Sequence, residues 1–226
     1  MSLLDAVIEN GPLPPDSVSQ AAKKRQSELL SDRLATAVAS GLRAAGFPKV
    51  RPLPGGPGER EFQGGLGPKK VDVSYADEQN GLMLAVSIKS INFAPFGKNL
   101  KNRFSDLCTE AISLHMRFPY AVVCALFAFP SSADRDLTPG RPVSTFQRAT
   151  RLFGTVSGRR EYTDPGEKFE NVTLMLYEPP SESGSAPFVR LVNTDTQAEM
   201  TEQEYYLMLR DLYNTRNPQA TIGEEE

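Results

Sequence analysis

The residues best suited to chemistry are an aspartate and a lysine that two neighbouring strands would bring together. Asp72 lies in an apolar-rich run, and Lys89 ends a second run that is otherwise nearly all apolar. Asn80-Gly81 separates the runs, and this dipeptide is a strong signal for a β-hairpin because both residues tolerate positive φ. A two-residue loop there puts Asp72 opposite Lys89, with Cβ atoms roughly 5 Å apart. A four-residue loop puts Asp72 opposite Ser87, still on the lysine's face of the sheet.

A carboxylate beside a lysine is the minimum set for metal-assisted hydrolysis of a phosphodiester. The metal offsets charge on the phosphate and activates water, while the lysine orients the water or stabilises the transition state. A glycine-rich segment at 64–68 precedes the first strand, so its backbone can approach a ligand closely. The same two residues would also form an ordinary structural ion pair. The hairpin alone therefore leaves both interpretations open.

Composition removes several other kinds of active site. His115 is the only histidine, which excludes most zinc sites and the nucleophilic triads that need a histidine base. It lies in a helical, partly apolar stretch, where packing is the expected role. No Gly-x-x-x-x-Gly-Lys-Ser/Thr sequence occurs, so a phosphate-binding loop of that type is absent. Carboxylates, lysine and an oxygen-preferring metal remain, and we expect Mg²⁺, with Mn²⁺ able to substitute.

Apolar segments, cysteines and charge indicate the compartment and the partners of the protein. The chain has no apolar run of about 18 residues and no signal-peptide pattern. Cys108 and Cys124 are expected to be reduced thiols, so we expect a cytoplasmic protein with no membrane partner. The net charge of −3 does not itself indicate nucleic-acid binding. However, residues 89–103 contain four basic side chains and no acidic one, a local charge compatible with phosphate contacts.

The pattern of apolar residues and breakers predicts one domain with two extensions. Residues 1–17 are expected to form a flexible arm, 18–214 a single domain, and 215–226 a disordered acidic tail. A nearly continuous apolar run at 120–129 predicts a central strand buried on both faces. The other expected elements are helices at 18–46, 99–117, 143–154 and 200–214, a hairpin at 69–91, strands at 171–178 and 187–193, and loops at 48–68 and 130–142. This order predicts an α/β fold, a mixed central β-sheet flanked by helices.

Two of the helices carry recognisable start signals. Ser19 is positioned to cap the first helix, and Gly46 to end it. Thr201, with Glu204 three residues later, predicts a capping box for the last helix. On the first helix, Glu28 lies one turn before a second acid and flanks the apolar stripe.

Several motifs occur in an order that carries a family resemblance. They are Glu28, Gly46-Phe47, Arg51, Lys70-Val71-Asp72 and Ala85-Val86-Ser87-Ile88-Lys89. This layout resembles the PD-(D/E)xK nuclease superfamily, and archaeal Holliday-junction resolvases in particular. The resemblance covers about residues 20–130 and implies a restriction-endonuclease-like core (αβββαβ), with residues 131–214 as additional strands and a helix. In those relatives a glutamate on the first helix, the aspartate and the lysine share the active site.

One position departs from the family pattern. The family usually has Glu or Asp where this chain has Ser87, and serine is a poor magnesium ligand. Some restriction enzymes with a similar Ser-x-Lys supply the missing acid from the following helix. Here that helix offers Asp106 and Glu110; Glu110 is preferred, because Asp106 can pair with Arg103. Glu28 is the other source, and the remaining alternative is a nuclease fold that has lost catalysis.

The resemblance implies a metal-dependent DNA endonuclease, acting in restriction or anti-phage defence. Asp72 would bind the metal together with Glu110 or Glu28, Lys89 would position or activate the water, and Ser87 would assist through a water or hydroxyl contact. The expected phosphate contacts are Lys70, Lys98, Lys101 and Arg103. DNA is the implied partner, and such enzymes often act as homodimers or with protein partners in a defence complex.

Two other functions remain open. The first is a non-catalytic nuclease-fold protein that binds DNA or assembles a defence complex. The second is an α/β domain in which the pair formed by Asp72 and Lys89 is purely structural.

Overall fold

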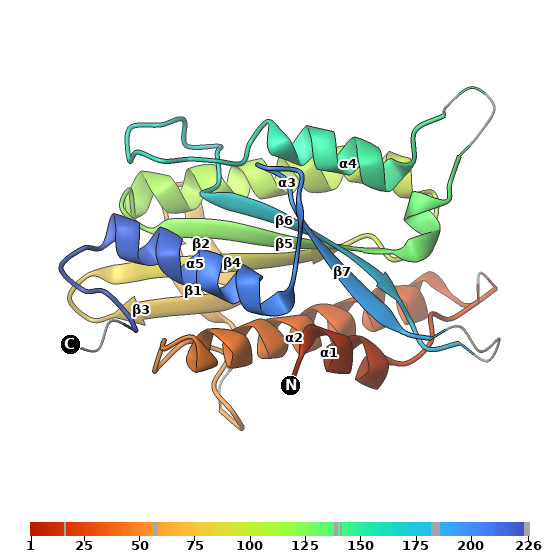
Figure 1. Cartoon of the computed structure of the whole chain (residues 1–226), viewed down its shortest axis with the longest axis horizontal. Coiled ribbons are helices and arrows are strands. Elements are labelled where there is room, and N and C mark those ends of the chain that lie inside the picture. Colours follow the sequence, from red (N-terminus) through yellow and green to blue (C-terminus); the bar gives the residue numbers. More distant parts are fainter. Residues whose placement is uncertain (16, 57, 138–139, 141, 182–185, 224–226) are drawn as a thin grey trace.

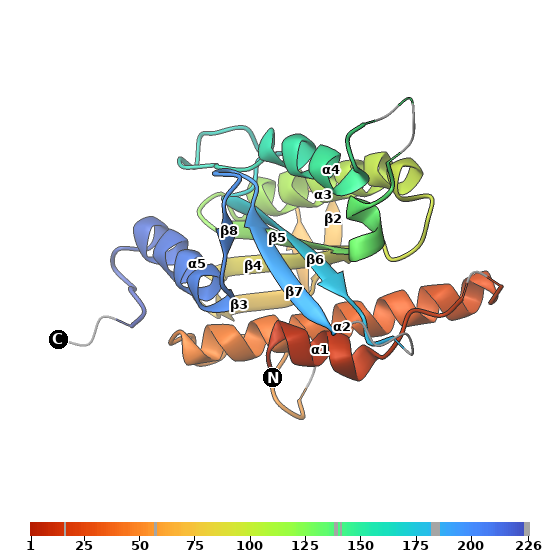
Figure 2. The same cartoon turned by 45° about the vertical axis from the view of Figure 1, so that its right-hand side comes forward.

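The described part of the chain folds around one mixed β-sheet with helices on both faces (Figures 1 and 2). The structure is a computed structural model that describes residues 1–223 apart from 16, 57, 138–139, 141 and 182–185. The helices are α1 (Leu3–Asn10), α2 (Gln20–Ala44), α3 (Phe96–Arg117), α4 (Thr145–Gly154) and α5 (Glu202–Arg216), with a short 3₁₀ helix at Ser131–Asp134. The strands are β1 (Arg60–Gly64), β2 (Gly67–Val71), β3 (Val73–Asp77), β4 (Gly81–Ser90), β5 (Val122–Pro130), β6 (Asn171–Glu178), β7 (Phe188–Asn193) and β8 (Glu199–Met200). The predicted α/β fold with a mixed sheet flanked by helices is confirmed.

The main sheet has parallel strands at its centre and antiparallel strands at its edges. Its order is β3-β4-β5-β6-β7-β8; β4, β5 and β6 run parallel, and the outer pairs are antiparallel. Every residue of β5 is buried, as the continuous apolar run predicted. Parallel strands need a crossover connection, and α3 and α4 lie in these connections on one face of the sheet (Figure 1).

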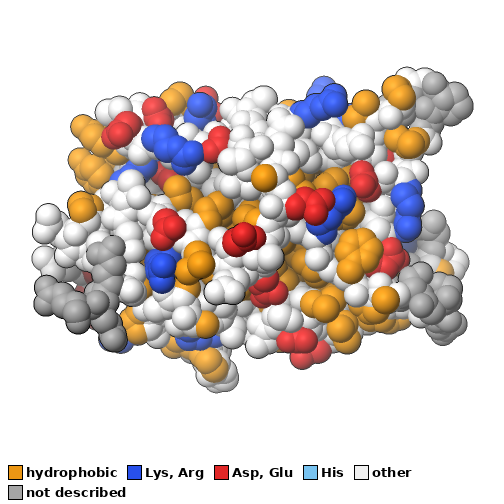
Figure 3. Space-filling model, viewed as in Figure 1, with side chains coloured by type: hydrophobic (Ala, Val, Ile, Leu, Met, Phe, Trp, Pro, Cys, Tyr) orange, Lys and Arg blue, Asp and Glu red, His pale blue; other side chains and the backbone are white. Residues whose placement is uncertain are grey.

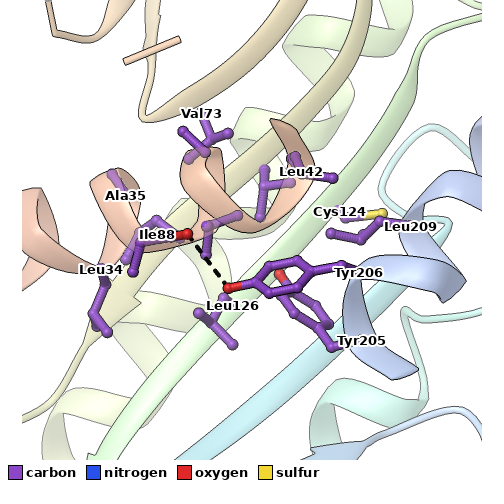
Figure 4. Close-up of a cluster of buried hydrophobic side chains, with 14 of the residues drawn as sticks. Leu34, Ala35, Leu42, Val73, Ile88, Cys124, Leu126, Tyr205, Tyr206 and Leu209 are labelled. Carbon is purple, nitrogen blue, oxygen red and sulfur yellow. Dashed lines mark hydrogen bonds between the residues drawn. The ribbon is translucent and has the colours of Figure 1, made fainter. Parts of the chain in front are cut away.

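The alternation of side chains along the strands separates two hydrophobic layers. Val86 and Ile88 of β4 pack in the layer covered by α1, α2 and α5, whereas Ala85 packs beneath α3 and α4. Figure 4 shows part of the first layer, where the Tyr206 hydroxyl donates a hydrogen bond to the carbonyl of Ala37. Gly41 lies against the Tyr206 ring, and a Cβ at this position would come within 2.1 Å of the ring. Because period-2 alternation continues along β4, odd-numbered side chains beyond Ala85 face α3.

The predicted helix caps are present. The Ser19 hydroxyl accepts a hydrogen bond from the backbone N–H of Ala22 at 3.2 Å, at the start of α2. Thr201 and Glu204 form the reciprocal capping box of α5. These local signals are reliable because each satisfies backbone N–H groups that would otherwise lack a partner.

The arm predicted for residues 1–17 is wrong over its first part. Residues 3–10 form α1, which begins with a capping box at Ser2, and Leu3, Ala6 and Val7 are buried in the core. The tail predicted for 215–226 is likewise ordered as far as it is described: the buried Ile222 exchanges two hydrogen bonds with the side chain of Asn214. In both segments a few apolar side chains add to an existing core, and this tertiary effect outweighs the local breakers. Residues 224–226 lie outside the described residues.

The hairpin differs from the prediction in its loop and in its first strand. Residues 78–80 form a three-residue loop, which the side chain of Asp77 closes. Before this loop, the strand register shifts at a bulge between Tyr75 and Ala76. Together these pair Val73 with Val86, so Asp72 lies opposite Ser87, as the longer-loop alternative requires, and not opposite Lys89. The predicted two-residue Asn-Gly loop is wrong.

The segment before the hairpin is also not a plain loop. Residues 60–71, expected to lie mostly in a glycine- and proline-rich loop, form β1 and β2, which pair as a separate antiparallel ribbon packed on α3. The chain bends at Asp72, between β2 and β3, so the strand expected to run continuously from Lys70 through Val73 is broken there. None of the helices in the described part of the chain has the length and apolar character that crossing a lipid bilayer requires.

Candidate active site

Four side chains from three separate segments meet near the carboxyl end of β4. Asp72 comes from the bend before β3, Ser87 and Lys89 from β4, and Glu110 from α3. Lys89 Nζ lies 3.4 Å from Asp72 Oδ2 and 3.3 Å from Glu110 Oε2. The Ser87 hydroxyl donates a hydrogen bond to Glu110 Oε1, and the backbone N–H of Ile88 donates to Asp72 Oδ2 at 2.6 Å. One ammonium group is thus held between two carboxylates that the sheet and a helix supply separately.

These groups are largely withdrawn from solvent. The side chains of Asp72 and Lys89 are each 23% exposed, and that of Glu110 is 10% exposed. Burial raises the pKa of Asp72 above its ordinary value, and the charge of Glu110 adds to this, while Lys89 and the Ile88 N–H act in the opposite direction. Burial lowers the pKa of Lys89, but the two carboxylates outweigh it and raise that pKa overall. Lys89 is therefore charged at neutral pH, and with both acids ionised the cluster carries one excess negative charge.

The cluster opens into a cleft of about 970 Å³. Its walls come from the first half of α2 and the first turns of α3, and Asp72 and Lys89 lie between them. Side chains of both charges line it, including Glu28, Lys98 and Arg103. Basic and acidic side chains are likewise interspersed on the face of the molecule shown in Figure 3, which has no extended basic surface. The cleft lies where β4 ends and α3 begins, close to the carboxyl ends of the parallel strands, where α/β proteins usually bind ligands.

The two glutamates considered as replacements for the acid expected at position 87 lie in different places, and only one of them joins the cluster. Glu110 contacts both Ser87 and Lys89. Glu28 lines the cleft on the α2 side, where its exposed carboxylate lies 3.6 Å from Lys24 Nζ. Asp106 pairs with Arg103 at 3.3 Å, the arrangement that made it the weaker choice on α3.

The expected phosphate contacts fall into two groups. Lys98 and Arg103 line the cleft. Lys70 is exposed on β2 and pairs with Glu59 at 3.3 Å, and Lys101 is exposed on α3; neither lines the cleft as the structure describes it. A single phosphate at Lys89 would therefore lie in the same cleft as Lys98 and Arg103, whereas Lys70 and Lys101 would meet only a longer ligand.

The two carboxylates of the cluster, Asp72 and Glu110, are ligands of the kind that Mg²⁺ binds. Across the residues described, no group of three or more His, Cys, Asp or Glu side chains is close enough together to hold a metal ion. Mg²⁺ is commonly bound in proteins by one or two carboxylates while keeping several waters. Asp72 and Glu110 provide two carboxylates beside one lysine, and the excess negative charge of the cluster favours a bound cation.

Asn92, a buried residue that the sequence did not mark as functional, lines the cleft and links three elements by hydrogen bonds. Asn92 Oδ1 accepts a hydrogen bond from the Tyr177 hydroxyl at 3.0 Å, and Asn92 Nδ2 donates to Ser27 at 3.0 Å and to Ser90 at 3.1 Å. These bonds join β6, α2 and the end of β4 at one point. The sequence holds no motif around Asn92, because its partners lie as far as 85 residues away.

Comparison with known proteins adds no relative: no family model matches the chain, and neither a curated protein nor a solved structure shows significant similarity to it.

Because the pKa of Asp72 is raised in the folded protein, its ionisation lowers the free energy of unfolding. The folded protein binds the Asp72 proton more tightly than the unfolded chain does, so stability falls as the pH rises above the ordinary value of 3.8. Asp72→Asn removes this ionisation, and its carboxamide oxygen can still accept from the Ile88 N–H. We expect the variant to be more stable than the wild type at pH 7, and the difference to vanish below about pH 3.8.

Urea unfolding of both proteins across this pH range measures the difference. A less stable Asp72→Asn variant at pH 7 would mean that the ion pair with Lys89 outweighs the burial of the carboxylate.

Proposed function

We propose that this protein is a magnesium-dependent DNA endonuclease with a restriction-endonuclease-like core. The observation that carries the proposal is the lysine held between two carboxylates, one from the strand region and one from the following helix, at a cleft whose lining includes Lys98 and Arg103 among side chains of both charges. Along the chain α2 is followed by β1, β2, β3, β4, α3 and β5, of which β1 and β2 form a separate ribbon; this order of helices and strands supports the proposed core. Restriction or anti-phage defence is the context that the resemblance implies.

Each residue of the cluster has a role that its contacts permit. Asp72 and Glu110 would hold the Mg²⁺, which when bound would offset phosphate charge and make a water molecule more acidic. Lys89, kept charged by the two carboxylates, would stabilise negative charge that develops on the phosphate as the water oxygen bonds to phosphorus and the ester bond breaks. Because it is already protonated, it would orient the attacking water and not remove its proton, which would pass to bulk solvent in the open cleft while solvent protonates the departing oxygen.

Ser87 would position a metal ligand, and two basic residues would position the DNA strand. The Ser87 hydroxyl fixes one oxygen of Glu110, so it would hold this carboxylate toward the metal without itself serving as a ligand. Lys98 and Arg103 would contact phosphates along the cleft and orient the strand without reading its sequence.

A second candidate is a non-catalytic DNA-binding subunit with the same fold. Ser87 stands where the family supplies an acid, and all three charged groups of the cluster already satisfy one another. This arrangement is also what a site that has lost its metal would retain.

Cleavage of supercoiled plasmid in Mg²⁺ or Mn²⁺ tests the proposal. We expect nicking by the wild-type protein, no nicking in EDTA, and a loss of about 10²-fold or more in both Asp72→Ala and Lys89→Ala. Arg160→Ala is the matched control, since this exposed arginine pairs with Asp195 and does not line the cleft.

Equal cleavage by the wild type and both cleft variants would contradict the assigned site. Retained DNA binding without any cleavage would instead support the non-catalytic subunit.

A further inference from the structure

An aromatic ring lies in the cleft beside the proposed catalytic cluster. Phe93, on the loop between β4 and α3, is half-buried and lines the cleft along with Asp72 and Lys89. Lys23 of α2 is buried and lines the same cleft, with Nζ 5.3 Å from the centre of the ring. This cation–π contact restrains the ring at the wall of the cleft.

The loop that carries Phe93 is firmly anchored. The preceding residue, Asn92, is buried and makes the three hydrogen bonds to Ser27, Ser90 and Tyr177 described above. The ring therefore stands on a preorganised loop, and a ligand that stacks on it loses little additional freedom.

The cleft wall beyond the ring is rich in groups that bind nucleotides. Exposed Asn99 and Asn102 of α3 present carboxamides, which can pair with the edges of bases, and Lys98 and Arg103 present cations for phosphates. Sequence-tolerant binding of single strands commonly combines a basic groove with aromatic rings on which bases stack. The cleft contains both elements within one space.

The depth of the cluster also bears on the form of the substrate. Asp72 and Lys89 are each about three-quarters covered, and walls from α2 and α3 rise on both sides. The cleft volume of about 970 Å³ is within the range of small-ligand pockets. A phosphate can reach this depth most easily on a strand whose bases are unpaired and free to turn.

We propose that the cleft binds a single DNA strand, with an unpaired base stacked on Phe93 and a neighbouring phosphate at Lys89. The position of that phosphate rests on the proposed nuclease function. The stacking itself depends only on Phe93 and the shape of the cleft. The substrates this favours are single strands, flaps, frayed ends and the unpaired regions that open in supercoiled plasmid, and not relaxed continuous duplex.

Binding of fluorescent DNA in EDTA tests the proposal without cleavage. Fluorescence anisotropy would compare a labelled oligothymidine with a duplex of equal length, at one salt concentration. We expect the 226-residue chain to bind the single strand about tenfold more tightly than the duplex. Phe93→Leu should weaken single-strand binding about tenfold, whereas Phe93→Tyr, which keeps the aromatic ring, should retain it.

Tyr120→Leu is the matched control. Tyr120 is an aromatic residue that is 58% exposed, has its ring centre 5.0 Å from that of Tyr162 and does not line this cleft, so we expect no more than about a twofold change. Circular dichroism melts would show that the Phe93 variants remain folded. Tighter binding of duplex, or equal single-strand binding by the wild type and Phe93→Leu, would overturn the inference.

The two proposals fail separately. Phe93-dependent binding of single strands by a protein that cleaves neither plasmid nor single-stranded DNA in Mg²⁺ would remove the nuclease function and leave the binding site. Plasmid cleavage that needs Lys89, by a protein whose single-strand binding ignores Phe93, would remove only the inference drawn here.

Discussion

Glu110→Gln is expected to slow plasmid cleavage by about 10²–10³-fold, and Glu28→Gln by less than about threefold. Glutamine keeps the size of the side chain and an oxygen that accepts from Ser87. It removes the negative charge that lies 3.3 Å from Lys89 and one of the two carboxylates available to Mg²⁺. Glu28 lies across the cleft beside Lys24, so its charge contributes little at the cluster.

The measurement is the initial rate of nicking as a function of Mg²⁺ concentration for both variants. A shift of the Mg²⁺ dependence in Glu110→Gln, in addition to a lower maximal rate, would identify a metal ligand. The assignment would have to be reversed if Glu28→Gln lost activity while Glu110→Gln kept it.

Glu170→Ala is expected to lower the free energy of unfolding by about 3–5 kcal/mol. Its side chain is 2% exposed, and its Oε1 lies 2.8 Å from Arg159 and 3.1 Å from Arg216. Its Oε2 lies 3.4 Å from His115 and accepts from the backbone N–H of Val123 at 2.8 Å, at the start of β5. Alanine would leave two guanidinium groups without their shared carboxylate, one of them on a side chain that is 1% exposed.

Urea unfolding at pH 7 measures the loss, with Glu199→Ala as the control. The Glu199 side chain is 64% exposed and pairs with Arg190, so its removal should cost no more than about 1 kcal/mol. Burial raises the pKa of Glu170, but His115, Val123 and Arg159 together hold it below the ordinary value of 4.5. Its contribution is therefore complete above about pH 4.5 and is lost as the pH falls through the folded-state pKa. Equal losses in the two variants would show that the buried cluster is not specially stabilising.

Local signals predicted most of the secondary structure. Caps at Ser19 and Thr201 and the apolar run of β5 depend on residues close together in sequence, so the elements that they define could be placed from the chain alone. The closeness of Asp72 and Lys89 was expected from the hairpin, whereas Glu110 was one of two carboxylates, with Glu28, that the family resemblance left open.

Features that depend on irregular backbone or distant partners could not be predicted. The bulge between Tyr75 and Ala76 shifts the register, and nothing in the sequence marks it. Likewise, Glu170 occurs in a polar segment that resembles a solvated loop. Its burial depends on Arg159 of the same α4–β6 connection, on His115 of α3 and on Arg216 of α5, so three parts of the fold have to come together.

The ribbon formed by β1 and β2 has a mechanical consequence for the two carboxylates. At one end it leads directly into Asp72. Near its turn, the N–H of Gly65 donates to the carbonyl of Ser113 at 2.7 Å, and the N–H of Leu66 donates to the Ser113 hydroxyl at 3.2 Å. Ser113 lies one helical turn beyond Glu110 on α3. The ribbon is thus a brace that sets the spacing between a carboxylate on the sheet side and one on the helix. Loosening its turn would misalign the pair without altering either acid.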